Sequence, residues 1–471
     1  MAWQAEIVHR HDPQIARLAD RALEYSLDRI RMDPVPLDAP KPYDELLAAV
    51  GETITTDGIG GERALQLFID VLAPACISVD HPRFLAFVPG APTEASVIFD
   101  MVVSASSIYT GSWLEGAGAA FAENQALRWL ADLAGFPNSA GGVFVSGGTA
   151  GNLSALIAAR HRWRLRAGGR LDRTRGIMIA SGGAHSSVAQ AAHAMDADVV
   201  SAPTDERGRL DADSVERVLG GLSADDRERV FAVIATGGTT NLGVVDDLDG
   251  ISRICNAQNI WFHIDGAYGL AALCAPSARR LFDGIERADS FIVDPHKWLF
   301  APYDSCALVY RNIHDGRRAH TQQAEYLDVL HGGEAEEGPW HEMNPADVAH
   351  HLSRRARGLP LWFSLATHGT RAYTDAMETT LTVAREAADE IRSRPNLELL
   401  LEPDLSILVF RRTGWTSEQY QRWSDDQLNT GQSFVVPTSW KGETVLRFCI
   451  VNPRTTMGDI TDILDSLDAT P

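Results

Sequence analysis

The stretch Ser290–Trp298 reads Ser-Phe-Ile-Val-Asp-Pro-His-Lys-Trp, so that an apolar run leads to a lysine between a histidine and a tryptophan. A buried strand rarely delivers an ammonium group to the protein interior, because desolvation disfavours the charged form. A lysine in this place can act as an amine nucleophile that forms a Schiff base with a carbonyl group. The alternative is a lysine that reaches solvent at a strand end, with Pro295 marking a turn. The functional interpretation predicts that other strand ends supply partners for Lys297.

Composition narrows the class of protein. The chain has 471 residues and a net charge of −21, from 63 acidic and 42 basic residues, which argues against nucleic acid and against an anionic membrane as partners. The five cysteines are scattered without a C-x-x-C pair, so we expect neither a disulfide framework nor a metal site. We find no signal peptide and no apolar run of membrane-spanning length, and we therefore expect a cytoplasmic protein.

Short apolar runs alternate with helical segments from about residue 141 onward. This alternation predicts an α/β fold with a mainly parallel central sheet and helices on both faces. Ligands of such sheets bind at the carboxyl ends of the strands. The predicted strands are 142–146, 176–181, 197–202, 230–236, 260–265, 290–294 and 305–311, and helices are expected to begin near 149, 184, 213, 246 and 275.

Three parts of the chain are expected: an N-terminal helical arm at 1–90, a large domain at 91–365 and a small C-terminal α+β domain at 366–471. The first helix, opened by Asp12 and Pro13, is apolar on two sides, which predicts burial on both sides, against either a partner subunit or the rest of the chain. Residues 331–345 are acidic and glycine-rich, so we expect a loop, either an inert linker or an active-site lid.

Two strand ends carry residues that suit an anion and a flat ring. The run at 142–146 leads into Gly147–Asn152 and then a helix, and glycines before a helix N-terminus suit a phosphate. The alternative is an ordinary turn with Thr149 as the N-cap. After the next strand comes His185, whose imidazole can stack on a planar ring or can simply stand at a helix start.

Two further strand ends carry hydroxyls and a carboxylate. Residues 236–240 read Thr-Gly-Gly-Thr-Thr and are either hydrogen-bonding groups or a turn of small residues. Asp265 ends the following strand, and Ala267 comes two residues later. A buried carboxylate needs a cationic or hydrogen-bonding partner, and a protonated pyridine nitrogen is such a partner. Alternatively, Asp265 caps the turn that follows. A phosphate site, a ring-stacking group, a carboxylate and an amine together suit pyridoxal 5'-phosphate (PLP).

The order of these motifs resembles that of the group II PLP-dependent amino acid decarboxylases, fold-type I enzymes that include the aromatic L-amino acid decarboxylases. The similarity runs from about His81 to the end of the chain and includes Arg354–Leu359 and Leu446–Phe448. The resemblance implies that Lys297 binds PLP covalently, that His185 stacks on the ring and that Asp265 pairs with the ring nitrogen. It also implies further cofactor contacts from Thr149, Ala150, Gly151, Thr239, Ala267 and His296. Family members are typically dimers whose active sites draw on both chains.

The match weakens in the segment expected to act on the substrate. Met343–Ala346 lacks the loop tyrosine that related enzymes use to protonate Cα, and His341, His350 or His351 could replace it, although 350 and 351 also suit a helix surface. Asp294 stands where the aromatic enzymes usually have asparagine. The proton donor therefore stays open at this stage.

The substrate pocket is expected to have the apolar walls Phe87, Tyr109 and Trp113, and to be roomy because Gly90 and Gly111 replace larger side chains. Arg447 either binds a substrate carboxylate or pairs with acids in the small domain. The predicted function is decarboxylation of an L-amino acid, expected to be aromatic, to an amine and CO2. The alternatives are an aldehyde synthase, an aminotransferase or a non-catalytic regulatory member of the fold.

Overall fold

The computed structural model describes residues 13–171, 173–322 and 342–469. Its large sheet has seven strands in the order β1-β7-β6-β5-β4-β2-β3. The strand β7 is antiparallel to both of its neighbours, and the β2–β3, β2–β4, β4–β5 and β5–β6 pairs are parallel. The mainly parallel sheet is therefore confirmed, at the predicted positions. The strands are β1 (Gly141–Val145), β2 (Ile177–Ser181), β3 (Asp198–Ala202), β4 (Val230–Thr236), β5 (Trp261–Asp265), β6 (Ser290–Val293) and β7 (Cys306–Tyr310).

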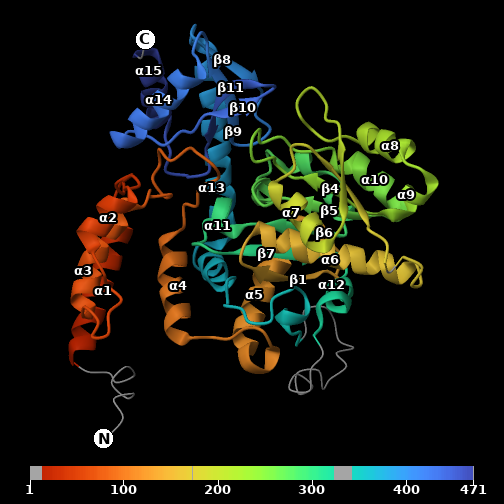
Figure 1. The fold of residues 1–471 in the computed structure, drawn as a ribbon, viewed down its shortest axis with the longest axis horizontal. Coiled ribbons are helices and arrows are strands. Elements are labelled where there is room, and N and C mark those ends of the chain that lie inside the picture. Colours follow the sequence, from red (N-terminus) through yellow and green to blue (C-terminus); the bar gives the residue numbers. More distant parts are fainter. Residues whose placement is uncertain (1–12, 172, 323–341, 470–471) are drawn as a thin grey trace, which may run out of the picture.

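Helices cover both faces of this sheet (Figure 1). Successive strand residues point to opposite faces: Val143 and Val145 join one buried apolar cluster, and Phe144 joins the other. The first cluster includes α6 and α7, and the second includes α5, α10 and α13. The helices of this domain are α4 (Glu94–Ser106), α5 (Trp113–Leu133), α6 (Gly148–Arg166), α7 (Ser186–Met195), α8 (Ala212–Gly221), α9 (Ala224–Arg229), α10 (Leu248–Gln258), α11 (Pro295–Trp298), α12 (Ile313–His320) and α13 (Leu359–Ser393).

One predicted helix is wrong. The segment expected to start a helix near residue 275 forms three short 3₁₀ turns instead, at Gly269–Cys274, Arg279–Phe282 and Ile285–Arg287. Pro276, between the first two turns, stops the first from continuing as an α-helix, and Gly284, with φ of 103° between the last two turns, interrupts the helix there. The predicted loop at 331–345 lies mostly outside the described residues, together with Asp12 and His341.

The C-terminal part forms its own four-stranded sheet in the order β10-β11-β9-β8, at the top of Figure 1. An unpredicted addition comes from the aromatic segment after His81: Leu85 N–H donates to the carbonyl of Phe434 at 2.9 Å, and its own carbonyl accepts from Cys449 N–H at 2.9 Å. The elements are β8 (Leu397–Leu401), β9 (Ile407–Arg412), β10 (Thr438–Trp440), β11 (Glu443–Cys449), α14 (Ser417–Asn429) and α15 (Met457–Ala469). The helix α13 is interrupted at Gly369, close to the predicted boundary at 365, which stays a prediction.

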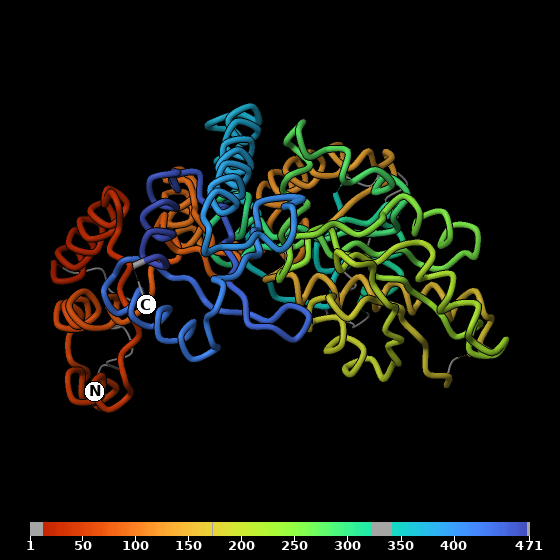
Figure 2. The backbone as a smooth tube through the Cα atoms, turned by 90° about the horizontal axis from the view of Figure 1, so that it is seen from above, coloured from red at the N-terminus to blue at the C-terminus, as the bar shows by residue number. Residues whose placement is uncertain are grey.

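The N-terminal helices α1 (Pro13–Arg31), α2 (Tyr43–Val50) and α3 (Gly61–Leu67) lie along one side of the molecule, in red in Figures 1 and 2. None of the residues of α1 is buried, and Ile15 and Leu23 are 46% and 51% exposed. The expected burial on two sides is therefore not found within the described single chain. No helix among the described residues is long and apolar enough to cross a membrane, and the cytoplasmic location stays a prediction.

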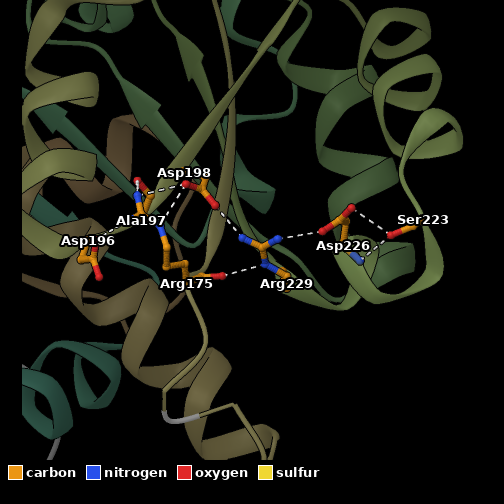
Figure 3. A network of polar contacts seen from close by, with 7 residues as sticks. All are labelled: Arg175, Asp196, Ala197, Asp198, Ser223, Asp226 and Arg229. Carbon is orange, nitrogen blue, oxygen red and sulfur yellow. Dashed lines mark hydrogen bonds and ion pairs between the residues drawn. The ribbon is translucent and has the colours of Figure 1, made fainter.

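A network of charged side chains lies at the edge of the large sheet formed by β3 (Figure 3). The Arg229 guanidinium contacts the Asp198 carboxylate at 2.5 Å and the Asp226 carboxylate at 2.7 Å, and Arg175 Nε donates to Asp198 Oδ1 at 3.0 Å. Asp198 opens the edge strand β3, and charged groups at a sheet edge oppose pairing with other chains. None of its residues belongs to the site described below, so a change at Asp198 can serve as a control for changes in the site.

Candidate active site

A cavity of about 240 Å³ opens at the carboxyl ends of β1, β4, β5 and β6. We call it the Lys297 cavity. It brings together six of the nine predicted cofactor-binding residues: Thr149, His185, Asp265, Ala267, His296 and Lys297. Its other walls are Gly147, Gly148, Asn152, Ser187, Thr236, Gly238, Thr240, Tyr268 and Asp294.

Lys297 lies on α11, a single helical turn directly after β6. The next residue, Trp298, fixes this turn in the core: its ring is fully buried, stacks on Tyr268 at a centroid distance of 5.1 Å, and its Nε1–H donates to Thr380 Oγ1 at 3.2 Å. The Tyr268 hydroxyl in turn bonds Ser406 in the small domain. The tryptophan of the His-Lys-Trp motif therefore anchors the lysine rather than contacting a ligand.

The Lys297 amine forms an ion pair with Asp294, whose Oδ2 lies 3.0 Å from Nζ. Burial by itself lowers the pKa of Lys297, but the Asp294 carboxylate, with a smaller contribution from Asp265, outweighs burial and leaves the pKa raised. The expectation that burial would favour a neutral amine is therefore wrong for the protein on its own. Asp294 is the cause, and its second oxygen, Oδ1, is buried without a hydrogen-bond partner among the described residues.

Asp265 ends β5, and its side chain is buried at 4% exposure. Its Oδ2 accepts from Asn152 Nδ2 at 2.9 Å, and its Oδ1 accepts from the N–H of Ala267 at 3.2 Å. Both donors are neutral, and among the described residues no cation pairs directly with this carboxylate. Burial of a carboxylate without a cationic partner costs free energy, which a positively charged ligand group would offset.

His185 stands at the N-cap of α7. Its Nδ1 accepts a hydrogen bond from the N–H of Ser187 at 3.2 Å and lies 2.9 Å from Ser187 Oγ. The ring is exposed on the side of the Lys297 cavity. His185 therefore stands at a helix start and also exposes its ring to the cavity. The ring-stacking interpretation and the helix-start interpretation are compatible.

The predicted phosphate site lies at the start of α6, whose N-cap is Gly147 and not Thr149. The N–H groups of Thr149 and Ala150 belong to the first helical turn and have no carbonyl to bind within the helix. The N–H of Gly151 already donates to Gly147 at 3.0 Å, so this residue has a packing role: a Cβ there would lie 2.8 Å from Ile292 Cγ2.

His296 faces the same region. Its Nδ1 accepts from the N–H of Ser305 at 3.0 Å, which leaves the ring proton on Nε2. Burial lowers the pKa of His296 against the opposing charge of Asp294. A Cβ on Gly147 would lie 3.8 Å from His296 Cε1, so the histidine is adjacent to the glycine-rich turn and can donate to a phosphate there.

The predicted cofactor contact Thr239 and the three predicted substrate-pocket residues lie outside the Lys297 cavity. Thr239 lines a neighbouring cavity of about 450 Å³, while Thr240 is in the wall of the Lys297 cavity. The three predicted substrate-pocket residues are not in that wall. Phe87 is 60% exposed, the Tyr109 hydroxyl donates to the carbonyl of Leu352 at 3.1 Å, and Trp113 begins α5.

Gly90 and Gly111, the glycines that suggested a roomy pocket, are explained by close packing of the backbone. A Cβ on Gly90 would lie 2.5 Å from the carbonyl oxygen of His296, and one on Gly111 would lie 2.0 Å from the Tyr109 hydroxyl and 2.7 Å from the Leu352 carbonyl oxygen. Both contacts are shorter than van der Waals packing allows. Close packing of the backbone therefore requires glycine at both positions, so the glycines alone do not indicate a roomier pocket, and its size stays a prediction.

His350 and His351, two of the three histidines considered as proton donors, do not line the Lys297 cavity, and His341 lies outside the described residues. His350 lies in an irregular segment rather than on a helix, with Nδ1 2.8 Å from Ser154 Oγ and its ring 3.9 Å from that of His351. Burial lowers the pKa of both rings.

Two residues of the cavity region went unrecognised in the sequence. Asn152 is the third residue after Thr149 on the same helix, so it shares the helix face that opens on the site. His263 lies two residues before Asp265 in β5 and shares its side of the strand. Helical and strand spacing could have found both.

The groups present fit PLP. The first-turn N–H groups of α6 and His296 suit its phosphate, the buried Asp265 carboxylate suits its protonated ring nitrogen, and Lys297 supplies the amine. At Gly148 a Cβ would lie 3.2 Å from Asp294 Oδ2, so glycine keeps the turn open beside the cavity. PLP, when bound, supplies an electron sink for the pair of electrons released from a bond to Cα. This fold and this site together define a PLP-dependent enzyme of fold type I.

Comparisons with known proteins give the family. The model of the pyridoxal-dependent decarboxylase conserved domain matches residues 61–413. The chain belongs to the pyridoxal-dependent decarboxylase family and is a PLP-dependent amino acid decarboxylase, a carboxy-lyase.

Similar proteins include an aromatic-L-amino-acid decarboxylase of Bacillus atrophaeus, 29% identical over 97% of this chain and 95% of the relative. An L-2,4-diaminobutyrate decarboxylase of Rhizobium meliloti is 30% identical over 83% of this chain and 78% of its own. The crystal structure of Oryza sativa TDC with PLP and tryptamine has a TM-score of 0.89 at 23% identity, covering 98% of this chain and 99% of that one. The relatives confirm the fold and the cofactor, and they differ in substrate.

Proposed function

We propose that this decarboxylase acts on an aromatic L-amino acid and releases the aromatic amine and CO2. The carrying observation is the charge of the Lys297 cavity. Its charged side chains, Asp265, Asp294 and Lys297, are all engaged with one another or assigned to the cofactor. Among the described residues the cavity therefore offers no spare charge for a cationic or acidic substrate side chain. The likeness to the Bacillus atrophaeus relative over nearly the full length supports the same substrate class.

The proposed site roles follow the geometry given above. Lys297 holds the cofactor, His185 covers its ring, Asp265 binds its ring nitrogen, and Thr149, Ala150 and His296 bind its phosphate. Ala267 lies against the ring, and Gly151 allows close packing behind the phosphate site. Phe87, Tyr109 and Trp113 remain proposed substrate contacts, which would require a surface beyond the single chain.

Arg447 is proposed to bind the substrate carboxylate. Its side chain on β11 is 6% exposed, and its Nε and Nη2 have no hydrogen-bond partner among the described residues. No acid pairs with it there, so the purely structural interpretation lacks its partner. Burial raises the pKa of Tyr268 in the cavity wall, and the positive charge of Arg447 counteracts that rise, which supports a place for the guanidinium near the site. Arg447→Lys should raise KM more than it lowers kcat.

We also propose a homodimer. Thirteen of the sixteen large apolar side chains exposed in the described residues precede residue 122. They lie on the N-terminal helices and the segments that join them, at Phe87, on α4 and on the first half of α5, and exposed apolar surface of this extent favours association. Light scattering of the purified protein should give twice the mass of 51.3 kDa. A monomeric mass at working concentration would contradict the dimer.

The test of the substrate is a screen of the common L-amino acids and L-2,4-diaminobutyrate with PLP-loaded protein, with CO2 measured and products identified by mass. The proposal predicts CO2 and an amine from tryptophan, tyrosine, phenylalanine or a hydroxylated relative. Preference for diaminobutyrate, glutamate or histidine would overturn the aromatic assignment. An aldehyde with ammonia and peroxide would show the oxidative alternative, for which the absence of a tyrosine at Met343–Ala346 leaves room.

A further inference from the structure

Asn152 lies at the centre of a buried set of hydrogen bonds that joins two sides of the site. Its side chain is buried, and Nδ2 donates to Asp265 Oδ2 at 2.9 Å and to Ser187 Oγ at 2.8 Å. Its Oδ1 lies 2.9 Å from His263 Nε2. Both amide hydrogens and the amide oxygen are therefore engaged, with three different neighbours.

Chemistry fixes the direction of the bonds on the Asp265 side. A carboxylate only accepts, so the NH₂ group of Asn152 faces Asp265 and its oxygen faces His263. An amide oxygen also only accepts, so His263 Nε2 carries a proton. Burial lowers the pKa of His263 to about 4, against the opposing charge of Asp265, and the ring is neutral at neutral pH. His263 Nδ1 then accepts from Ser290 Oγ at 2.8 Å, and that oxygen accepts from Trp261 Nε1–H at 2.9 Å.

The other branch runs from Asn152 to His185 through Ser187. The Ser187 hydroxyl oxygen accepts from Asn152 and lies 2.9 Å from His185 Nδ1. The backbone N–H of Ser187 donates to the same nitrogen at 3.2 Å. A ring nitrogen that accepts from a backbone N–H carries no proton, so the Ser187 hydroxyl donates to it as well. The neutral His185 ring therefore has its proton on Nε2, and two bonds to Nδ1 fix its rotation.

We propose that Asn152 is a positioning residue which, through Ser187, couples the orientation and tautomer of His185 to the carboxylate of Asp265. The inference rests on the proposed roles of Asp265 at the ring nitrogen and His185 at the ring face of PLP. One side chain then sets both groups, so that a change at one is transmitted to the other. A leucine would fill the same space and would leave Asp265 Oδ2, Ser187 Oγ and His263 Nε2 without their common partner.

A double-mutant cycle on the PLP dissociation constant tests this coupling without relying on activity. The variants of the full-length protein are Asn152→Leu, His185→Phe, which keeps a flat ring but removes Nδ1, and the pair. We expect each single change to weaken PLP binding, and the combined loss to fall short of the product of the two by at least about threefold. A combined loss equal to the product would overturn the coupling.

The second measurement uses cofactor-free protein labelled with ¹⁵N-histidine. The His185 signals are assigned by their absence in His185→Phe, and in the wild type they should report the Nε2–H tautomer. Asn152→Leu should change these signals although Asn152 does not touch the imidazole. Unchanged His185 signals in that variant would also overturn the proposal, because Asn152 would then serve Asp265 alone.

Matched controls separate coupling from general damage. Asn452→Leu removes another buried asparagine, which donates to the carbonyl of Asp80 at 3.0 Å, and Ser424→Ala removes a buried hydroxyl that donates to the carbonyl of Val435 at 2.6 Å. Neither should alter the His185 signals. If Asn152→Leu does not fold, Ser187→Ala breaks the same connection and takes its place in both measurements.

The measurements distinguish a failure of the coupling from a failure of the proposed function. Multiplicative losses or unchanged histidine signals in a protein that releases CO2 would refute the coupling and leave the proposed function. Coupled losses in a protein that binds PLP and releases no CO2 from aromatic substrates would refute the proposed function alone.

Discussion

Replacing Asp294 with asparagine should accelerate the attachment of PLP to Lys297 at neutral pH. The Asp294 Oδ2 atom lies 3.0 Å from Nζ, where two unit charges attract by roughly 5.5 kcal/mol at an effective dielectric constant of about 20. Desolvation of the pair and the 23% exposure of the lysine side chain offset part of this attraction. If a net 1.4 kcal/mol or more remains, the neutral amine becomes at least about tenfold more abundant at a given pH in the variant.

The direction with pH follows from the raised pKa of Lys297, which burial lowers but Asp294 raises to a greater extent. Only the neutral amine attacks a carbonyl, so attachment accelerates as pH rises towards that pKa. Asp294→Asn lowers the pKa and moves the whole profile to lower pH, and the two proteins converge at high pH.

Stopped-flow absorbance after mixing cofactor-free protein with PLP, from about pH 6 to about pH 10, measures this profile. Asp198→Asn in the network of Figure 3 is the matched control and should leave the profile in place. Profiles that coincide for wild type and Asp294→Asn, or a shift of the variant to higher pH, would refute the role given to Asp294.

Three further changes test close packing and buried charges elsewhere in the fold. Gly90→Ala should lower the free energy of unfolding by about 1–3 kcal/mol in denaturant titrations, because its Cβ would lie 2.5 Å from the His296 carbonyl oxygen; wild-type stability would contradict the packing argument. Arg354→Met should cost about 3–5 kcal/mol by leaving the buried carboxylate of Glu123, 2.8 Å from Arg354 Nη1, without its partner, and equal stability would contradict this. Burial raises the pKa of Asp246 to about 7, so the folded state holds a proton that the unfolded state has released: this stability is fully present below about pH 4 and is lost as pH rises through about 7. Urea midpoints against pH should show this slope in the wild type and not in Asp246→Asn, and equal slopes would contradict the assignment.

The sequence predicts the large sheet well because every strand except the edge strand β3 is buried on both faces and therefore appears as a continuous apolar run. The seven runs match the seven strands, and the residues after β1, β2, β4, β5 and β6 lie on the side of the site, whereas the antiparallel β7 ends at the opposite edge. The small strands β8 and β10 were missed because they are partly exposed and carry little pattern. The 3₁₀ turns after β5 were missed because Ala- and Leu-rich composition suggests an α-helix.

In the site too, some residues are predictable from strand order and others only from the three-dimensional contacts. Lys297, Asp265 and His185 follow strands directly, so their placement required only strand order. The ion pair of Lys297 with Asp294 depends on the geometry of a single helical turn, and the sequence argument considered burial without this neighbour. Asn152 is a neutral residue inside a helix: helical spacing places it on the face of the site, but its role depends on contacts with two other elements, β5 and α7. Gly90 and Gly111 were misjudged because a glycine required by close packing looks, in sequence, like a missing side chain.

The central claim is that Lys297 is the residue that binds PLP covalently in this site. The most direct measurement is the visible absorption spectrum of purified protein with PLP, for the wild type and for Lys297→Ala, followed by mass analysis of the peptide containing residue 297 after borohydride reduction. The account predicts a visible band and a PLP-modified Lys297 in the wild type, and neither in the variant. No visible band in the wild type, or a modification on a different lysine, would contradict it.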